Sequence, residues 1–310
     1  MFTNSKKKFH CGFCKSRRGF WTVIIIAIVV ALSVSQKSDA KTFQDMAVDV
    51  KGEGPAILFI PGLNSASETF TETCEAFVKT YSCHLLHLPG FAGLPPTPAT
   101  QQQFLVTMRD TIRAYIDNAQ LKHPILIGHS LGGVLSLMLA IDDPELARAL
   151  IIVDALPFYP AIHNPALTSD LVLAQAEQMR AMMRALPPEQ YHQNAAMNLT
   201  GMSNNSERLP LLTEWSNTSD PLTTTQAMYD MMTTDLRPDL HKITTPTLVL
   251  GAWAAYKNYG STQESTRMIY ASQYAQLKNV DIRMATDAFH FITWDEPQWA
   301  HQEIAQFLNQ

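Results

Sequence analysis

The sequence has 310 residues, of which 46% are apolar, so it can bury one large core or two modest ones. With 28 acidic and 23 basic residues, its formal net charge is −5. This balance argues against nucleic-acid binding, because that function needs a positively charged surface.

The N-terminal segment, residues 1–40, has the pattern of an export signal. Lysines and arginines precede an apolar stretch over residues 20–35, and Ser38 and Ala40 are small residues suited to cleavage before Lys41. The apolar stretch is short for a membrane span. We therefore expect an exported protein, periplasmic or secreted. An uncleaved segment that anchors the same domain to the membrane is the alternative.

Cleavage would change the charge of the remaining chain. Residues 1–40 contain seven of the 23 basic residues and one of the 28 acidic residues, so the mature charge would be about −11. The clustered basic residues thus belong to the targeting signal, and we expect no nucleic-acid partner.

Apolar runs alternate with helical patterns through most of the remaining chain. Short apolar runs, several of them closed by glycine or proline, are typical of strands buried in a parallel sheet. Such runs lie at residues 56–60, 83–88, 124–128, 149–153, 246–251 and 280–284, and helices are expected over residues 67–80, 101–119 and 131–141. The alternation predicts an α/β fold, with a mostly parallel twisted sheet flanked by helices.

This alternation is interrupted between residues 157 and 240. The segment is rich in methionine and has no run typical of a buried strand, so we interpret it as a helical cap. Its methionines fit either core filling or the lining of a pocket. The expected organisation is therefore a core in two parts, residues 41–156 and 241–310, with the cap inserted between them.

Four cysteines form two pairs along the chain. Cys11 and Cys14 lie in the expected export signal and lack the second ligand pair of a zinc site, so no metal is expected. Cys74 and Cys83 lie in the exported part, where oxidation is permitted. We expect a disulfide between them, joining a helix to the following strand; two buried free thiols are the alternative.

Residues 128–132 match the pattern G-x-S-x-G, with Ser130 at its centre. The match follows an expected strand and precedes an expected helix that starts with Gly132 and Gly133. In this context the pattern forms a tight, strained turn that exposes the serine. The helix N-terminus also favours negative charge nearby. Together these features predict that Ser130 is a nucleophile.

With this motif the sequence resembles the α/β-hydrolase superfamily, in particular its capped esterase-like and C–C-hydrolase-like members. The resemblance covers residues 45–310 and includes residues 60–64, where the family places its oxyanion loop. Pro61 replaces the family's usual histidine, a change that leaves the backbone donors in place. The resemblance implies that the N–H groups of Leu63 and Leu131 form the oxyanion hole.

The resemblance also implies a base and an acid, in the chain order serine, acid, histidine. His290 follows the last expected strand, as the family's catalytic histidine does, and is the expected base. No carboxylate follows the run at residues 246–251, the family's commonest site for the acid. Asp154 is therefore the expected acid, with a turn cap as its alternative role. Asp287 is the competing residue, but it would share the loop of His290.

These residues imply acyl transfer by an exported hydrolase that cleaves an ester-type bond of a small molecule without a cofactor. His290 would take the Ser130 proton, and Asp154 would orient the imidazole. A C–C or amide-bond hydrolase with the same triad is one alternative. A non-catalytic ligand-binding relative is another, although an intact triad argues against it.

Overall fold

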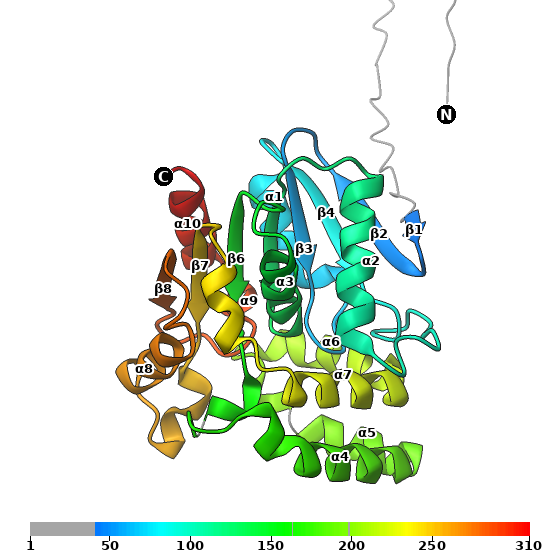
Figure 1. Cartoon of the computed structure of the whole chain (residues 1–310). Coiled ribbons are helices and arrows are strands. Elements are labelled where there is room, and N and C mark those ends of the chain that lie inside the picture. Colours follow the sequence, from blue (N-terminus) through cyan, green and yellow to red (C-terminus); the bar gives the residue numbers. More distant parts are fainter. Residues whose placement is uncertain (1–40, 163, 198) are drawn as a thin grey trace, which may run out of the picture. The chain divides into compact units, whose positions relative to one another are not determined.

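Eight strands form one sheet at the centre of the structure (Figure 1). The structure is a computed structural model that describes residues 41–162, 164–197 and 199–310, so the expected export signal lies outside the described residues. The strands are β1 (Lys41–Phe43), β2 (Met46–Lys51), β3 (Ala56–Ile60), β4 (Ser82–His87), β5 (Ile125–His129), β6 (Ala149–Val153), β7 (Thr247–Gly251) and β8 (Val280–Met284).

The strand order is β1-β2-β4-β3-β5-β6-β7-β8. β2 pairs antiparallel with β1 and with β4, and every other neighbouring pair is parallel. All residues of β3, β5, β6 and β7 are buried, because helices cover both faces of the sheet. The predicted fold class, a mostly parallel sheet flanked by helices, is confirmed.

Helices on the two faces create separate apolar clusters. One cluster packs α2 (Phe104–Asn118) and α3 (Leu131–Asp142) against the sheet, and the other packs α1 (Thr71–Phe77) and α10 (Pro297–Leu308) against the opposite face. The helices outside the segment between β6 and β7 are η1 (Ser67–Phe70), α1 (Thr71–Phe77), α2 (Phe104–Asn118), α3 (Leu131–Asp142), η6 (Ala254–Tyr259), α8 (Gln263–Gln273), α9 (Ile292–Asp295) and α10 (Pro297–Leu308).

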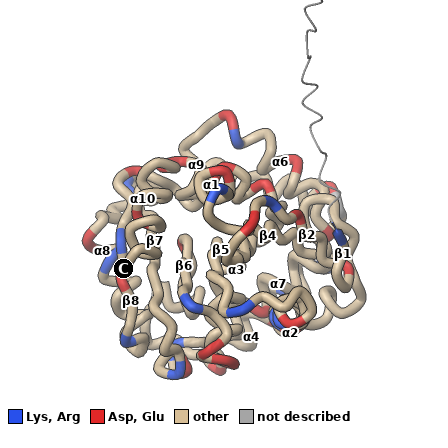
Figure 2. Tube along the Cα trace, turned by 90° about the horizontal axis from the view of Figure 1, so that it is seen from above, with Lys and Arg blue, Asp and Glu red and all other residues tan. Residues whose placement is uncertain are grey.

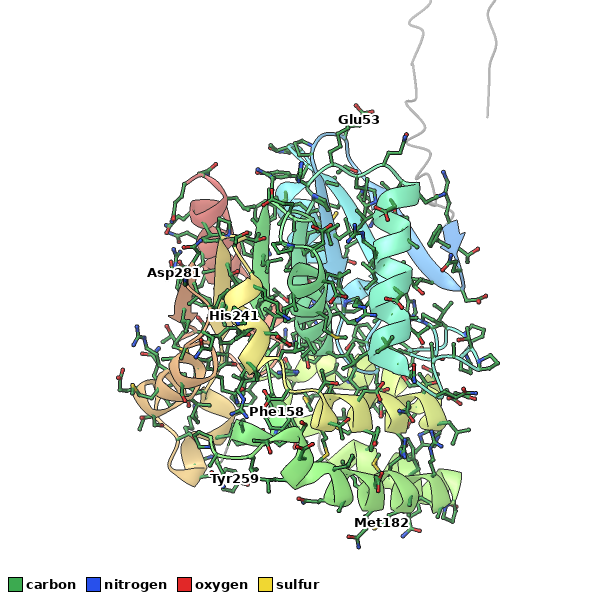
Figure 3. All side chains as sticks on the ribbon, viewed as in Figure 1. Glu53, Phe158, Met182, His241, Tyr259 and Asp281 are labelled. Atoms are coloured by element: carbon green, nitrogen blue, oxygen red, sulfur yellow. The ribbon has the colours of Figure 1, made fainter. Side chains whose placement is uncertain are left out.

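The described chain between β6 and β7 is helical, and we call it the cap. Its helices are η2 (Tyr159–Ile162), α4 (Ser169–Ala185), α5 (Pro188–Met197), η3 (Leu199–Gly201), η4 (Ser206–Arg208), α6 (Leu209–Thr218), α7 (Pro221–Thr233) and η5 (Arg237–Lys242). In Figure 1, α6 and α7 lie below the sheet, and α4 and α5 lie below them. Met182, on the outer side of α4, points away from the sheet (Figure 3).

Charged positions are mixed along the described chain. Seen from above, lysine and arginine positions are interspersed with aspartate and glutamate positions (Figure 2). Helices within the described residues are all too short or too polar to cross a membrane.

The structure contradicts the predicted disulfide, because Cys74 and Cys83 are both free thiols. Cys74 lies on α1 and Cys83 on β4, and both are buried in the cluster between α1, α10 and the sheet. The Cys83 thiol donates to the Cys74 carbonyl oxygen at 3.6 Å. Its hydrogen bond with the Cys74 side chain, together with burial, raises the pKa of the Cys83 thiol. The two cysteines are neighbours as predicted, but packing and a weak hydrogen bond accommodate them without oxidation.

Candidate active site

Ser130 lies at the sharp turn between β5 and α3. Its backbone has φ 52° and ψ −120°, in a region that side-chain-bearing residues rarely adopt. Two glycines of the motif permit this turn: a Cβ on Gly128 would collide with the Gly132 carbonyl, and a Cβ on Gly132 would collide with Ile60 O. The Ser130 N–H donates to Val153 O at 2.9 Å, which fixes the turn to the end of β6.

The loop after β3 lies directly against the nucleophile. A Cβ built on Gly62 would lie 3.1 Å from the Ser130 Cβ, so a larger residue at position 62 would displace its neighbours by a few tenths of an ångström. Within the described residues, the N–H groups of Leu63 and Leu131 donate to no protein acceptor. Leu131 opens α3, where N–H groups have no partner within the helix. Among the described residues, neither predicted oxyanion donor is thus engaged by a protein acceptor.

Asp154 and His290 meet at the same edge of the sheet. Asp154 directly follows β6, and its Oδ2 accepts a hydrogen bond from His290 Nδ1 at 2.6 Å. Its Oδ1 accepts from the Ala252 N–H at 2.8 Å and from the Tyr270 hydroxyl at 2.6 Å. Because a carboxylate only accepts, His290 carries its proton on Nδ1 and leaves Nε2 as an acceptor. The structure thus joins the predicted acid to the predicted base.

Asp287 is not joined to His290. Its side chain is 64% exposed and pairs with Lys257 Nζ at 3.0 Å. The competing carboxylate of the sequence thus faces solvent on the surface of its loop. Asp154, by contrast, is tied to the neighbouring strand because its own N–H donates to Leu250 O at 2.8 Å.

Tyr270 is a site residue that the sequence did not reveal. It lies on α8, a helix that was not predicted, and its hydroxyl donates to Asp154. Burial, and then the charge of Asp154, raise the pKa of the Tyr270 phenol well above its usual value, so the hydroxyl stays a donor. The available signal was the spacing of Tyr270 and Tyr274, which places two aromatic residues on one helical face. That spacing does not say what the face contacts.

His129 connects the turn at Ser130 to His290. Its Nε2 donates to the His290 carbonyl oxygen at 3.0 Å, and the two imidazole rings lie 4.5 Å apart. The side chain is 2% exposed, and its ring also packs on Phe291 at 4.6 Å. Burial, with a contribution from His290, lowers the pKa of His129 well below its usual value. His129 is therefore neutral. Because His129 directly precedes Ser130, its hydrogen bond holds the main chain of His290 close to the turn at Ser130.

The described part of the chain offers no cluster of side chains that could bind a metal ion. Among residues 41–162, 164–197 and 199–310, no group of three or more histidine, cysteine, aspartate or glutamate side chains could hold a metal ion.

Comparisons with known proteins agree with the fold. A model of the alpha/beta hydrolase fold family matches residues 55–297, more than half of the chain. The sequence is 29% identical to pimeloyl-[acyl-carrier protein] methyl ester esterase of Aeromonas hydrophila over 138 residues, covering 44% of this chain and 52% of that protein. The chain spans about half or less of the length of the first curated relatives it matches.

Solved structures are similar in fold at low sequence identity. A hydrolase from Pseudomonas aeruginosa PA01 has a TM-score of 0.71 at 16% identity, covering 89% of this chain and all of that one. The enol-lactonase from Burkholderia xenovorans LB400 has a TM-score of 0.68 at 13% identity, covering 87% of this chain and all of that one. Identities this low show a common fold and leave the reaction to be argued from the site.

Proposed function

The chain belongs to the α/β-hydrolase family, and from this premise we propose that it is a serine hydrolase that cleaves ester-type bonds through an acyl-enzyme on Ser130. Within this proposal Asp154 and His290 complete a catalytic triad. The fold alone would not identify the reaction, because one fold hosts many activities.

One observation carries the proposal: His290 is bound on two sides, by the predicted acid and by the residue that precedes the predicted nucleophile. Its Nδ1 donates to Asp154 at 2.6 Å, and its carbonyl accepts from His129, the neighbour of Ser130, at 3.0 Å. Nucleophilic catalysis requires a base that lies near the nucleophile and is oriented by a third group. The bond to Asp154 orients His290, and the bond from His129 ties its main chain to the nucleophile's turn.

The proposed reaction proceeds in two acyl transfers. His290 Nε2 accepts the Ser130 proton as the serine oxygen attacks the carbonyl carbon, and Asp154 stabilises the resulting imidazolium. The N–H groups of Leu63 and Leu131 stabilise the oxyanion, each typically by about 3 kcal/mol. His290 then gives its proton to the leaving group, and water, activated by the same histidine, releases the acyl product.

The test of this function is the reactivity of Ser130 toward a fluorophosphonate probe, combined with turnover of p-nitrophenyl acetate. Ser130→Ala should abolish labelling and lower kcat by at least about 10⁴-fold, while the fold is retained. Ser136→Ala is the matched control, because Ser136 lies further along the same helix and its hydroxyl donates to Gly132 O at 2.9 Å. Substantial residual activity in Ser130→Ala would refute the proposed nucleophile.

The bond type needs a comparison of substrates, since esterases, amidases and C–C hydrolases can share this triad. Matched ester, amide and vinylogous-ketone substrates should be assayed on the same preparation. The similarity to a methyl ester esterase favours the ester, and we expect the highest kcat/KM there. Faster cleavage of the ketone would assign the C–C reaction instead, with the roles of Ser130 and His290 unchanged.

Export is a separate proposal that depends on the pattern of residues 1–40. We expect the exported protein to begin at Lys41. Intact-mass measurement of protein recovered from the exported fraction tests this expectation. A mass that includes residues 1–40 would support the anchored alternative.

A further inference from the structure

The loop that carries His290 is held by two consecutive carboxylates. We call residues 285–291, between β8 and α9, the histidine loop. Glu296 accepts hydrogen bonds from three backbone N–H groups of this loop, those of Thr286, Asp287 and Ala288. These bonds stay within the C-terminal part of the chain.

Asp295 differs from Glu296 because it binds the histidine loop and the cap at once. Its Oδ2 accepts from the N–H of Phe289, the residue before His290, at 2.8 Å, and from the N–H of Asn204 at 3.2 Å. Its Oδ1 accepts from the Ser203 hydroxyl at 2.5 Å. Ser203 is 3% exposed, so its hydroxyl has little access to water as an alternative partner.

Further contacts follow the same seam between cap and loop. The N–H of Phe291, the residue after His290, donates to Met202 O at 3.0 Å. The Asn204 side chain donates to Asp287 O at 2.8 Å. Phe291 therefore bonds directly to residues 202–204, and Phe289 is connected to them through Asp295. We call residues 202–204 the latch.

An apolar cluster supports the latch. Trp215, on cap helix α6, lies 5.6 Å from the Trp294 ring, and Trp294 stacks on Phe291 at 4.4 Å. A movement of α6 relative to the sheet must therefore either break this aromatic packing or carry α9 and the end of the histidine loop with it.

From these contacts we propose that Asp295 is a positioning residue that couples the latch of the cap to His290. It acts through the backbone of Phe289 and does not touch the reacting atoms. When the latch is in place, the shared carboxylate holds the loop so that His290 Nδ1 meets Asp154. When the latch is displaced, both carboxylate oxygens lose their cap partners, Ser203 and the Asn204 N–H, and Asp295 no longer fixes the histidine loop relative to the cap. The position of the cap thereby determines whether His290 is oriented to act as the base. The coupling rests on the proposed function of Ser130 and His290.

The test combines Ser203→Ala with a matched control, Ser206→Ala, in the full-length chain. Ser206 is an exposed serine three residues along, whose hydroxyl makes no hydrogen bond to Asp295. With p-nitrophenyl acetate, a small ester, Ser203→Ala should lower kcat about tenfold with KM changed less than twofold. Ser206→Ala should match the wild type in both constants.

A second series examines the carboxylate itself. Asp295→Asn should lower kcat more than Ser203→Ala does, and Asp295→Glu, which keeps the charge and the acceptors, should restore part of the loss. Circular dichroism establishes that each variant is folded. If Asp295→Asn does not fold, Ser203→Ala decides the question, because it removes one hydroxyl and leaves the bond to Phe289.

A spectroscopic measurement separates this coupling from the proposed function. The His290 Nδ1 proton, bonded to Asp154, should give a downfield proton resonance that shifts or broadens in Ser203→Ala and not in Ser206→Ala. An unchanged kcat together with an unchanged resonance in Ser203→Ala would overturn the coupling, and so would a change in KM alone. Absence of ester turnover and of Ser130 labelling in the wild type would instead refute the proposed function, and the resonance would still test the coupling.

Discussion

The sheet and the cap are held in place by different forces. In β3, β5, β6 and β7 every residue is buried, and nearly all of the contacts are apolar. In α4, the outer helix of the cap, the buried residues are Val172 and Ala176, whereas Leu171 and Met182 are 69% and 62% exposed. The sheet is therefore fixed by burial, and the cap has less burial to hold it.

Directional hydrogen bonds from single side chains attach the cap to the core. Asp230 of α7 accepts from the N–H groups of Phe104 and Leu105 at the start of α2. Thr224 of α7 donates to Asn64 in the loop beside Ser130 at 2.6 Å. A typical hydrogen bond contributes about 1 kcal/mol net, whereas truncating a buried aliphatic side chain costs about 2–5 kcal/mol. The sheet therefore supplies a rigid platform, while the outer helix of the cap, α4, can be altered with little loss of stability.

The largest expected effect concerns the acid that the platform holds. Asp154→Asn should lower kcat about 10⁴-fold, because the amide favours the wrong imidazole tautomer. Asp287→Asn should lower kcat tenfold or less, since Asp287 is bound to Lys257 at the loop surface. Steady-state turnover of an ester that the wild type accepts measures both. The reverse order would show that the acid assignment is wrong, while the roles of Ser130 and His290 would survive.

Truncating one side chain in the sheet and one in the cap measures how differently the two regions are packed. Ile152→Ala in β6 should lower the free energy of unfolding by about 2–5 kcal/mol, because Ile152 is fully buried between sheet and helices. Met182→Ala on the outer side of α4 should change it by less than about 0.5 kcal/mol. Urea denaturation of both variants provides the measurement. Equal losses would mean that the cap is as tightly packed as the sheet.

The two tyrosines Tyr270 and Tyr274 differ in the group that accepts from their hydroxyls, so they form a matched pair for a test. Tyr270→Phe removes a hydrogen bond to the charged Asp154, and bonds to charged groups contribute about 1.5–3 kcal/mol. We expect kcat to fall roughly tenfold to a hundredfold. Tyr274→Phe is the control, because the Tyr274 hydroxyl donates to the Ala155 carbonyl and not to the carboxylate. A similar loss of kcat in both variants would indicate a general effect on α8 rather than on Asp154.

Much of the platform could be predicted from the sequence. The boundaries of β3 and β6 match the predicted runs, because strands buried on both faces appear as continuous apolar segments. The boundaries of β8 match as well, although this edge strand is half-buried and contains Asp281 and Arg283. β1 and β2 were not predicted, since they lie at the sheet's antiparallel edge and neither is a continuous apolar run; β1 has three residues, and β2 contains Asp49 and Lys51. The disulfide prediction was wrong because cysteine spacing indicates proximity and not oxidation.

The site was predicted only in part, for a physical reason. Local sequence context identified Ser130, and the family's chain order pointed to Asp154 and His290; their catalytic roles stay predictions. The contacts of Tyr270 with Asp154 and of Ser203 with Asp295 join residues that lie 116 and 92 positions apart. Such polar contacts leave no periodic pattern, so they become visible only when the chain is folded.

The smallest expected effect is on the pH dependence of the free energy of unfolding. It tests whether His129 is the buried neutral group that connects the turn at Ser130 to His290. Burial lowers the pKa of His129 in the folded state, whereas in the unfolded chain the pKa is about 6.5. The unfolded state therefore binds more protons below that pH. The contribution of His129 to stability is complete above about pH 6.5, and it is lost as the pH falls, by up to about 1.4 kcal/mol per pH unit.

His129→Gln keeps a side-chain N–H that can donate to the His290 carbonyl and removes the titrating group. Its free energy of unfolding, measured by urea denaturation between about pH 4.5 and 7.5, should fall less steeply toward acid than that of the wild type. Part of the slope should remain, because burial also lowers the pKa values of His84, His87 and His301. His123→Gln is the control, since His123 is exposed. An unchanged slope in His129→Gln would mean that His129 is not the buried neutral group that ties the turn at Ser130 to His290.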